Sequence, residues 1–119
     1  MKLSENFARH EFACSCGCGF DTIDAATLEV LEEVRRYFGR PVIVTSGARC
    51  REYNASVGGV PESQHILGRA ADIKVQDHPP MAVADFIAER FPSASIGRYI
   101  TFTHVDTRSD GPARWGSHG

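Results

Sequence analysis

Glycine and proline interrupt this chain so often that only short helices and strands can form between them. Eleven Gly and six Pro occur in 119 residues, and both residue types favour turns over the interiors of regular elements. At this length we expect a single domain, residues 1–119, with a core of modest size. A small domain with many loops often depends on a bound metal or on disulfides for its stability.

The composition argues against several classes of protein. Hydrophobic residues make up 42% and charged residues 24%, which is typical of a globular domain. No apolar run approaches the ~20 residues of a membrane-spanning helix, and the segment from Met1 to Asn6 does not resemble a secretory signal. The net charge of −2 argues against a basic surface for nucleic acid. We therefore expect neither a nucleic-acid partner nor a membrane span.

Periodic apolar residues predict two clear helices. Between Asp24 and Phe38 such residues recur at steps of three and four, which places them on one face. A second helix is expected after a cap at Asp77, and Pro92 would end it. A shorter helix is predicted over residues 51–57.

Three β-strands are predicted between turn residues, over 41–45, 70–75 and 99–106. The first twenty residues are predicted to form an irregular, cysteine-rich arm. Helices and strands in this order indicate an α+β fold, in which a small antiparallel sheet packs against helices and long loops.

The densest polar segment runs from Ser63 to Asp72. It contains a histidine and an aspartate whose side chains could meet at one point. A turn at Gly68 would let His65 and Asp72 converge. His104 arrives from the third predicted strand. Two imidazoles and one carboxylate suit a Zn²⁺ ion with an open fourth position, where the pKa of a bound water falls to about 7. Judged on spacing alone, the alternative is an ordinary His–Asp hydrogen bond at the surface.

Several separated motifs follow one another along the chain in a characteristic order. Residues 63–72 read Ser-x-His-x-x-Gly-x-Ala-x-Asp, and His-Val-Asp follows at 104–106. The segments 45–50 and 54–59 contain Ser-Gly-Ala-Arg-Cys and Asn-Ala-Ser-Val-Gly-Gly. With the segment 106–115, these motifs resemble the zinc D-Ala-D-Ala carboxypeptidase and murein endopeptidase family, whose superfamily includes lysostaphin-type peptidases and the hedgehog signalling domain. The resemblance spans residues 3–116 and implies the hedgehog/D-Ala-D-Ala peptidase-like fold.

The resemblance implies roles for individual residues. His65, Asp72 and His104 match the zinc ligands of the family. Arg49 matches an arginine that polarises the scissile carbonyl or holds a substrate carboxylate, because its planar guanidinium can donate two hydrogen bonds to one carboxylate. Ser63 matches a residue that hydrogen-bonds to substrate. The alternatives are an exposed salt bridge for Arg49 and a capping hydroxyl for Ser63.

The general base is where the chain departs from the family pattern. Many relatives carry an acid three residues before the last ligand, or a histidine two residues before it, and Thr101 and Phe102 occupy these positions here. Asp106 shares a strand face with His104, about 7 Å along. It is either the base or, as we favour, a partner that orients a ligand. Tyr99 is a donor to the developing oxyanion or, alternatively, a half-buried strand aromatic.

The four cysteines allow two interpretations. Cys14, Cys16 and Cys18 lie in the N-terminal arm, and Cys50 directly follows Arg49. One or two disulfides could join the arm to the Cys50 loop, which an oxidising cell envelope favours. The other interpretation is a thiolate metal site or free thiols, which the missing signal peptide favours. The one-residue gaps are tight for the Cys-x-x-Cys pairs of zinc ribbons.

Taken together, the sequence predicts a zinc-dependent metallopeptidase that cleaves peptidoglycan stem peptides or cross-links, of the D-Ala-D-Ala carboxypeptidase or endopeptidase type. The alternative is a non-catalytic, zinc-containing peptidoglycan-binding module, which the absence of an acid at Thr101 favours. We expect a monomer that acts at the cell wall or in the periplasm. The lack of an export signal also fits a phage-encoded or virion-associated lytic enzyme.

Overall fold

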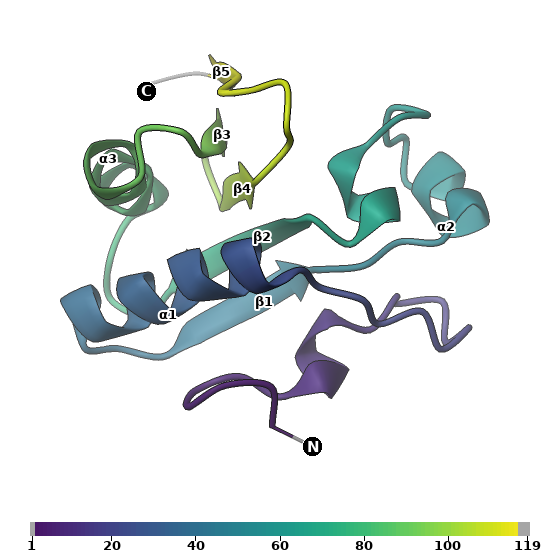
Figure 1. Ribbon diagram of the computed structural model, residues 1–119, viewed down its shortest axis with the longest axis horizontal. Coiled ribbons are helices and arrows are strands. Elements are labelled where there is room, and N and C mark those ends of the chain that lie inside the picture. Colours follow the sequence, from purple (N-terminus) through teal and green to yellow (C-terminus); the bar gives the residue numbers. More distant parts are fainter. Residues whose placement is uncertain (1, 117–119) are drawn as a thin grey trace.

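A five-stranded sheet with helices packed against it organises the chain (Figure 1). The computed structural model describes residues 2–116. The elements in chain order are a 3₁₀-helix Arg9–Phe12, α1 Ala25–Phe38, β1 Val42–Ser46, α2 Arg51–Ser56, a 3₁₀-helix Gln64–Leu67, β2 Ala70–Val75, α3 Pro80–Arg90, β3 Ser95–Arg98, β4 Thr103–Asp106 and β5 Arg114–Gly116. This confirms the α+β class. None of the helices in this part of the chain combines the length and apolar character needed to cross a membrane.

Helix α1 forms where the sequence predicts it, because both of its ends carry suitable residues. The Asp24 carboxylate accepts a hydrogen bond from the Thr27 backbone N–H at 3.0 Å, which satisfies a free donor of the first turn. Gly39 ends the helix in the left-handed conformation, at φ 65°. Between these ends, Val30, Leu31 and Val34 are buried.

Helix α3 begins later than predicted. Asp77 does not cap it: this residue has φ 67° in a tight turn, and His78 bridges back to Val75 of β2. The chain therefore reverses before the helix starts. Pro79 occupies the N-cap and Pro80 the first helical position, where a missing backbone N–H costs nothing.

The strand predicted over 99–106 is confirmed only from Thr103 to Asp106, because residues 99–102 form a turn. Strand β3 lies before this turn and β4 after it, and the two pair antiparallel with Ile96 opposite Val105. The turn between them carries Tyr99, Ile100 and Phe102, which imitate a strand pattern although Ile100 is 87% exposed. Strand β3 was not predicted.

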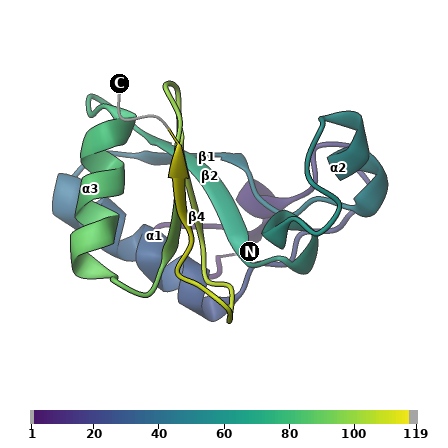
Figure 2. The ribbon, with the colours of Figure 1, turned by 90° about the horizontal axis from the view of Figure 1, so that it is seen from above.

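The sheet is mixed rather than wholly antiparallel. Its strand order is β1-β2-β4-β3-β5, and the short edge strand β5 pairs parallel with β3. Helices α1 and α3 contact each other and the central strands, and Figure 2 shows the sheet edge-on beside them.

The two faces of the sheet have different roles. Alternate residues of β2, β3 and β4 point into the core, which is formed by the buried side chains Ala71, Ile73, Val75, Ile96 and Val105 with apolar residues of α1, α3 and the N-terminal arm. Burying an aliphatic side chain of this kind contributes roughly 1.5–3 kcal/mol. The intervening residues, which include Asp72, His104 and Asp106, belong to the opposite face. This face carries the candidate site.

Candidate metal centre

Three potential ligands reach one point from three segments. His65 lies in the 3₁₀-helix before β2, and Gly68 reverses the chain at φ 70°. Asp72 on β2 and His104 on β4 are direct cross-strand partners. A Cβ at Gly68 would lie 2.6 Å from the Thr22 methyl group, so this turn accommodates only glycine. The structure thus confirms the expected turn between the histidine and the aspartate.

The ligand atoms are close enough to share an ion. The Asp72 Oδ1 atom lies 3.2 Å from His65 Nε2 and 2.9 Å from His104 Nδ1. All three side chains are buried, and their ligand atoms lie within 4.8 Å of one another. Zinc bonds of about 2.0–2.2 Å in a tetrahedron place such atoms roughly 3.3 Å apart. The donor set therefore fits zinc in both chemistry and spacing.

The outer nitrogen of each imidazole is held by a hydrogen-bond acceptor. His65 Nδ1 lies 2.7 Å from the Gly47 carbonyl oxygen, and His104 Nε2 lies 2.7 Å from Asp106 Oδ2. Each outer nitrogen donates its proton there, so His65 Nε2 and His104 Nδ1 are the nitrogens whose lone pairs a metal beside Asp72 would use. Metal-binding histidines characteristically have such a partner.

Asp106 is fully buried, and both of its oxygens are engaged. The Arg108 guanidinium donates to Oδ1 at 2.9 Å and to Oδ2 at 2.8 Å. Burial raises the pKa of Asp106, but the hydrogen bonds from Arg108 and His104 outweigh this and hold it well below its ordinary value. This carboxylate is placed to orient His104. It has no oxygen free to accept a proton from water.

The site as a whole favours positive charge between its carboxylates. Burial raises the pKa of Asp72, but hydrogen bonds with His104 and His65 lower it to about 2. Burial lowers the pKa of His104, yet hydrogen bonds to Asp106 and Asp72 raise it above its ordinary value. The surroundings of His104 thus stabilise a cation, whether a proton or a metal ion.

Arg49 is held at the edge of the ligand cluster from three sides. Its guanidinium donates to Ser46 Oγ at 3.0 Å, to Asn54 Oδ1 at 3.2 Å and to Asp72 Oδ2 at 3.3 Å. Asn54 is itself fixed, because its amide donates to the Val60 carbonyl oxygen at 2.7 Å. Arg49 is therefore part of a partly buried network, and the alternative of an exposed salt bridge is wrong.

A cleft of 470 Å³ opens over the three ligands. Its walls also include Arg49, Gly59, Glu62, Ser63, Tyr99, Arg108 and Trp115. The Ser63 hydroxyl accepts the His65 backbone N–H at 3.2 Å, which is the capping role predicted as an alternative. The Tyr99 hydroxyl accepts the Trp115 indole N–H at 2.9 Å, and Tyr99 lies in the turn after β3 rather than within a strand.

Three residues of this network were not predicted to have a role at the site. Asn54 fixes Arg49, Arg108 fixes Asp106, and the Trp115 ring lies 5.1 Å from the His104 ring. Asn54 and Trp115 belong to the motifs that carry the family resemblance, which was the available signal. These contacts depend on side-chain rotamers and on the paths of loops, so no local sequence pattern could assign them.

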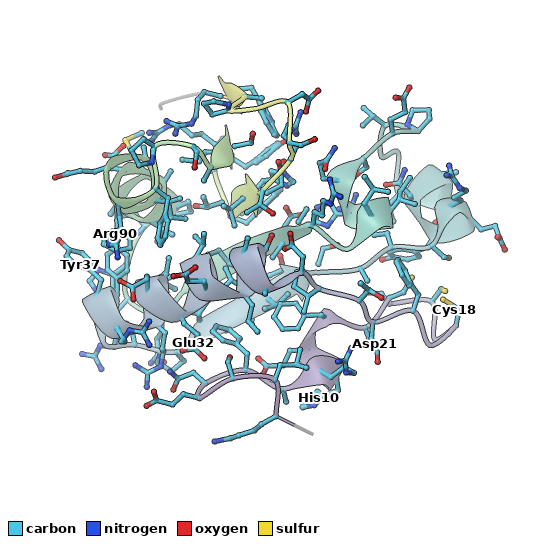
Figure 3. The ribbon with its side chains drawn as sticks, in the orientation of Figure 1. His10, Cys18, Asp21, Glu32, Tyr37 and Arg90 are labelled. Carbon is cyan, nitrogen blue, oxygen red and sulfur yellow. The ribbon has the colours of Figure 1, made fainter. Side chains whose placement is uncertain are left out.

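A second hollow, of 520 Å³, lies elsewhere, between α1 and α3. Tyr37, Phe86 and Arg90 line it, and Figure 3 labels Tyr37 and Arg90 on that side of the molecule. The Tyr37 and Phe86 rings stack at 4.2 Å. None of its described lining residues belongs to a potential metal-binding group. The chemistry therefore points to the smaller cleft.

All four cysteines are free thiols in the structure, so the predicted disulfides find no support in it. Their sulfur atoms nevertheless cluster at the end of the molecule where Figure 3 labels Cys18. Burial raises the pKa of Cys14, but hydrogen bonds from Cys16 and Cys50 outweigh this and lower it to about 7.

The α+β fold, with two imidazoles and a carboxylate converging in a cleft, defines a metallopeptidase-like domain. A family profile described as Peptidase M15 matches residues 5–106. The chain therefore belongs to the M15 family of peptidases, as its motifs predict. A search of curated proteins finds no match.

Proposed function

We propose that the protein is a zinc-dependent peptidase that cleaves peptide bonds in peptidoglycan stem peptides or cross-links. The observation that carries this proposal is the convergence of His65 Nε2, Asp72 Oδ1 and His104 Nδ1 beneath an open cleft. The proposed protein is a monomer that acts at the cell wall or in the periplasm. A phage-encoded lytic enzyme fits this description.

The three ligands would hold zinc, and the protein supplies the remaining groups. When bound, zinc lowers the pKa of water to about 7 and polarises a carbonyl oxygen. Asp106 keeps the His104 ring in the tautomer that a ligand requires. Arg49 donates to Asp72 Oδ2 and so holds this carboxylate in its orientation.

Three side chains have donors left for substrate. A guanidinium has five N–H groups, and Arg49 uses three in its described contacts. The remaining two suit a terminal carboxylate or a scissile carbonyl of the peptide. Ser63 and Tyr99 accept hydrogen bonds through their hydroxyl oxygens, so their own protons are free to bind substrate oxygens. The Tyr99 proton suits the developing oxyanion.

Glu62 is our candidate for the proton acceptor. The other two carboxylates at the site, Asp72 and Asp106, are engaged by imidazole and guanidinium groups. Glu62 lines the cleft and is exposed, and in this proposal its carboxylate accepts the proton of the attacking water.

The test is to incubate the zinc-loaded protein with purified peptidoglycan and to measure new amine termini, with mass spectrometry of the released muropeptides. Loss of one terminal D-Ala per stem would indicate a carboxypeptidase, and conversion of cross-linked dimers to monomers an endopeptidase. Release should stop with a chelator and with His104→Ala. It should persist with His10→Ala, a control at an exposed position outside the site.

The second candidate is a zinc-containing module that binds peptidoglycan without cleaving it. The engagement of both Asp106 oxygens, together with threonine at position 101, favours this candidate. One zinc ion at the histidine site, saturable binding to peptidoglycan and no amine release would establish it and would refute the peptidase.

A further inference from the structure

A second cluster of potential ligands lies outside the cleft, at the end of the molecule that carries α2 (Figure 3). Cys14, Cys16 and Cys18 come from the loop after the first 3₁₀-helix, and Cys50 is the N-cap of α2. The four sulfur atoms lie within 4.8 Å of one another. Residues more than thirty positions apart thus bring four sulfurs to one point.

We propose that Cys14, Cys16, Cys18 and Cys50 bind a second, structural zinc ion. The Sγ atoms of Cys14 and Cys16 lie 3.5 Å apart, those of Cys16 and Cys50 3.7 Å, and those of Cys14 and Cys50 3.9 Å. Zinc–sulfur bonds of about 2.3 Å in a tetrahedron require sulfur separations of roughly 3.8 Å. The measured sulfur–sulfur distances are slightly shorter or slightly longer than this value.

This sulfur geometry differs from that of a disulfide. A disulfide brings two sulfurs to about 2.05 Å, whereas here three sulfurs are almost equidistant. Four thiolates in a tetrahedral arrangement select soft ions, and zinc is the one that binds them without redox chemistry. Harder ions such as Mg²⁺ and Ca²⁺ prefer oxygen ligands.

The backbone around the cluster supports thiolate ligands. The Cys50 N–H donates to Cys14 Sγ and the Tyr53 N–H donates to Cys50 Sγ, each at 3.4 Å. Gly17, between Cys16 and Cys18, and Gly19, directly after Cys18, have φ values of 84° and 95°, which allow the arm to bend sharply around its cysteines. The bend lets three cysteines separated by single residues face one centre, so the tight spacing does not exclude a tetrahedral site.

The cysteine site would also fix the backbone next to the cleft. Cys50 follows Arg49, the Arg49 N–H donates to the His65 carbonyl oxygen at 3.1 Å, and the Ala48 N–H donates to the Phe12 carbonyl oxygen at 2.8 Å. A metal that holds Cys50 to the arm therefore limits movement of the segment that carries Arg49. Structural zinc of this kind contributes directly to folding stability.

The test counts metal ions by elemental analysis of the full chain purified in zinc. We expect two zinc ions per chain in the wild type. Each of the two double variants, Cys16→Ser/Cys18→Ser and His65→Ala/His104→Ala, should hold one zinc ion per chain. The conservative variant Cys18→His should retain both ions, because three cysteines and one histidine also form a zinc site. The proposal would be overturned if the wild type held a single zinc ion that the histidine variant lacks. Iron bound at the cysteines would also overturn it.

Cobalt substitution separates this proposal from the peptidase and does not depend on the cysteine variants. The His65→Ala/His104→Ala chain loaded with Co²⁺ should show the sulfur-to-cobalt charge-transfer band, whatever the fate of peptidase activity. In the zinc-loaded wild type, a thiol reagent should modify the four cysteines only after a chelator is added. Immediate modification of all four thiols, or a mass that indicates a disulfide in the freshly purified chain, would contradict a zinc site.

Discussion

At the scale of single residues, the Asp106 carboxylate decides which nitrogen of His104 faces the cleft. Its Oδ2 atom accepts the Nε2 proton, and Arg108 holds both carboxylate oxygens in place. The ligand nitrogen is therefore Nδ1, 2.9 Å from Asp72 Oδ1. Zinc bound at this site would therefore depend on a carboxylate that is not itself one of the three candidate ligands.

We predict that Asp106→Asn weakens zinc binding at the histidine site by about 10- to 100-fold, the usual effect of removing such a partner. An asparagine replaces the charged acceptor of the His104 proton with a weaker neutral one and removes the carboxylate that Arg108 binds with two nitrogens. Competition with a chromophoric chelator measures the change. Asp110→Asn, at an exposed position, is the control, and equal affinities of the two variants would contradict the role of Asp106.

Glu62→Gln tests the proton acceptor directly. We expect kcat for peptide release to fall by roughly 10²- to 10⁴-fold, the usual contribution of a general base, with zinc content unchanged. Glu52→Gln, an exposed glutamate on α2, should retain full activity. An unaltered kcat in Glu62→Gln would remove this residue from the mechanism.

The three candidate ligands could be named from the sequence because they belong to one short motif and one strand. The interactions that orient them could not be predicted, because Arg49–Asn54 and Asp106–Arg108 are side-chain contacts that depend on rotamers and loop paths. The sequence identified Arg49 and Asp106 as candidates, yet it could not show which of the Asp106 oxygens are engaged.

At the scale of elements, the turn at Gly68 links the 3₁₀-helix to β2 and so sets the distance between His65 and Asp72. It combines a left-handed backbone with a close neighbour, since a Cβ there would lie 2.8 Å from the Thr22 carbonyl oxygen. Gly39, at the end of α1, has a similar φ of 65° but nothing within 4 Å of a Cβ.

We predict that Gly68→Ala lowers the free energy of unfolding by more than Gly39→Ala does. Both substitutions incur the left-handed penalty of roughly 1–2 kcal/mol. Only Gly68→Ala must also displace Thr22, which would move His65 relative to Asp72 and weaken zinc binding. Urea unfolding and zinc titration of the two variants measure these effects. Equal losses of stability would show that the close contact does not matter.

Elements differ in how clearly the sequence predicts them. Helix α1 has a regular apolar face and a residue suited to each end, so its bounds were predictable. Strand β5 has three residues and exists only because it pairs with β3, which lies far from it in the sequence. The turn at residues 99–102 misled the prediction because its apolar residues face the cleft and solvent rather than the core.

At the scale of the whole molecule, ionised carboxylates hold distant segments together. Asp72 joins the 3₁₀-helix, β2 and β4, and Glu32 on α1 accepts hydrogen bonds from Ser4 and Asn6 of the N-terminal arm. Burial raises the pKa of Glu32, but the bonds from Ser4 and Asn6 lower it below its ordinary value. The folded chain therefore stabilises the charged forms of both groups.

We predict that the metal-free protein loses stability as the pH falls from about 4 to about 2. A carboxyl group whose pKa is lower in the folded state than in the unfolded state stabilises the protein at pH values above its unfolded pKa. This contribution disappears as the pH falls through the pKa of the folded state. For Asp72, a shift from 3.8 to about 2 corresponds to about 2 kcal/mol. Chemical unfolding at several pH values in a chelator measures the loss. Asp72→Asn should make the stability depend less on pH. An equally steep loss of stability in this variant would show that other groups cause it.

The alternation of side chains along β2 and β4 has a consequence for how this protein can vary. Inserting or deleting one residue within either strand would turn the ligand toward the helices and an aliphatic neighbour toward water. Loops can lengthen or shorten without this exchange. Tolerance to insertions should therefore follow the strand boundaries, and a library with single-residue insertions at every position would reveal the two strands as intolerant blocks.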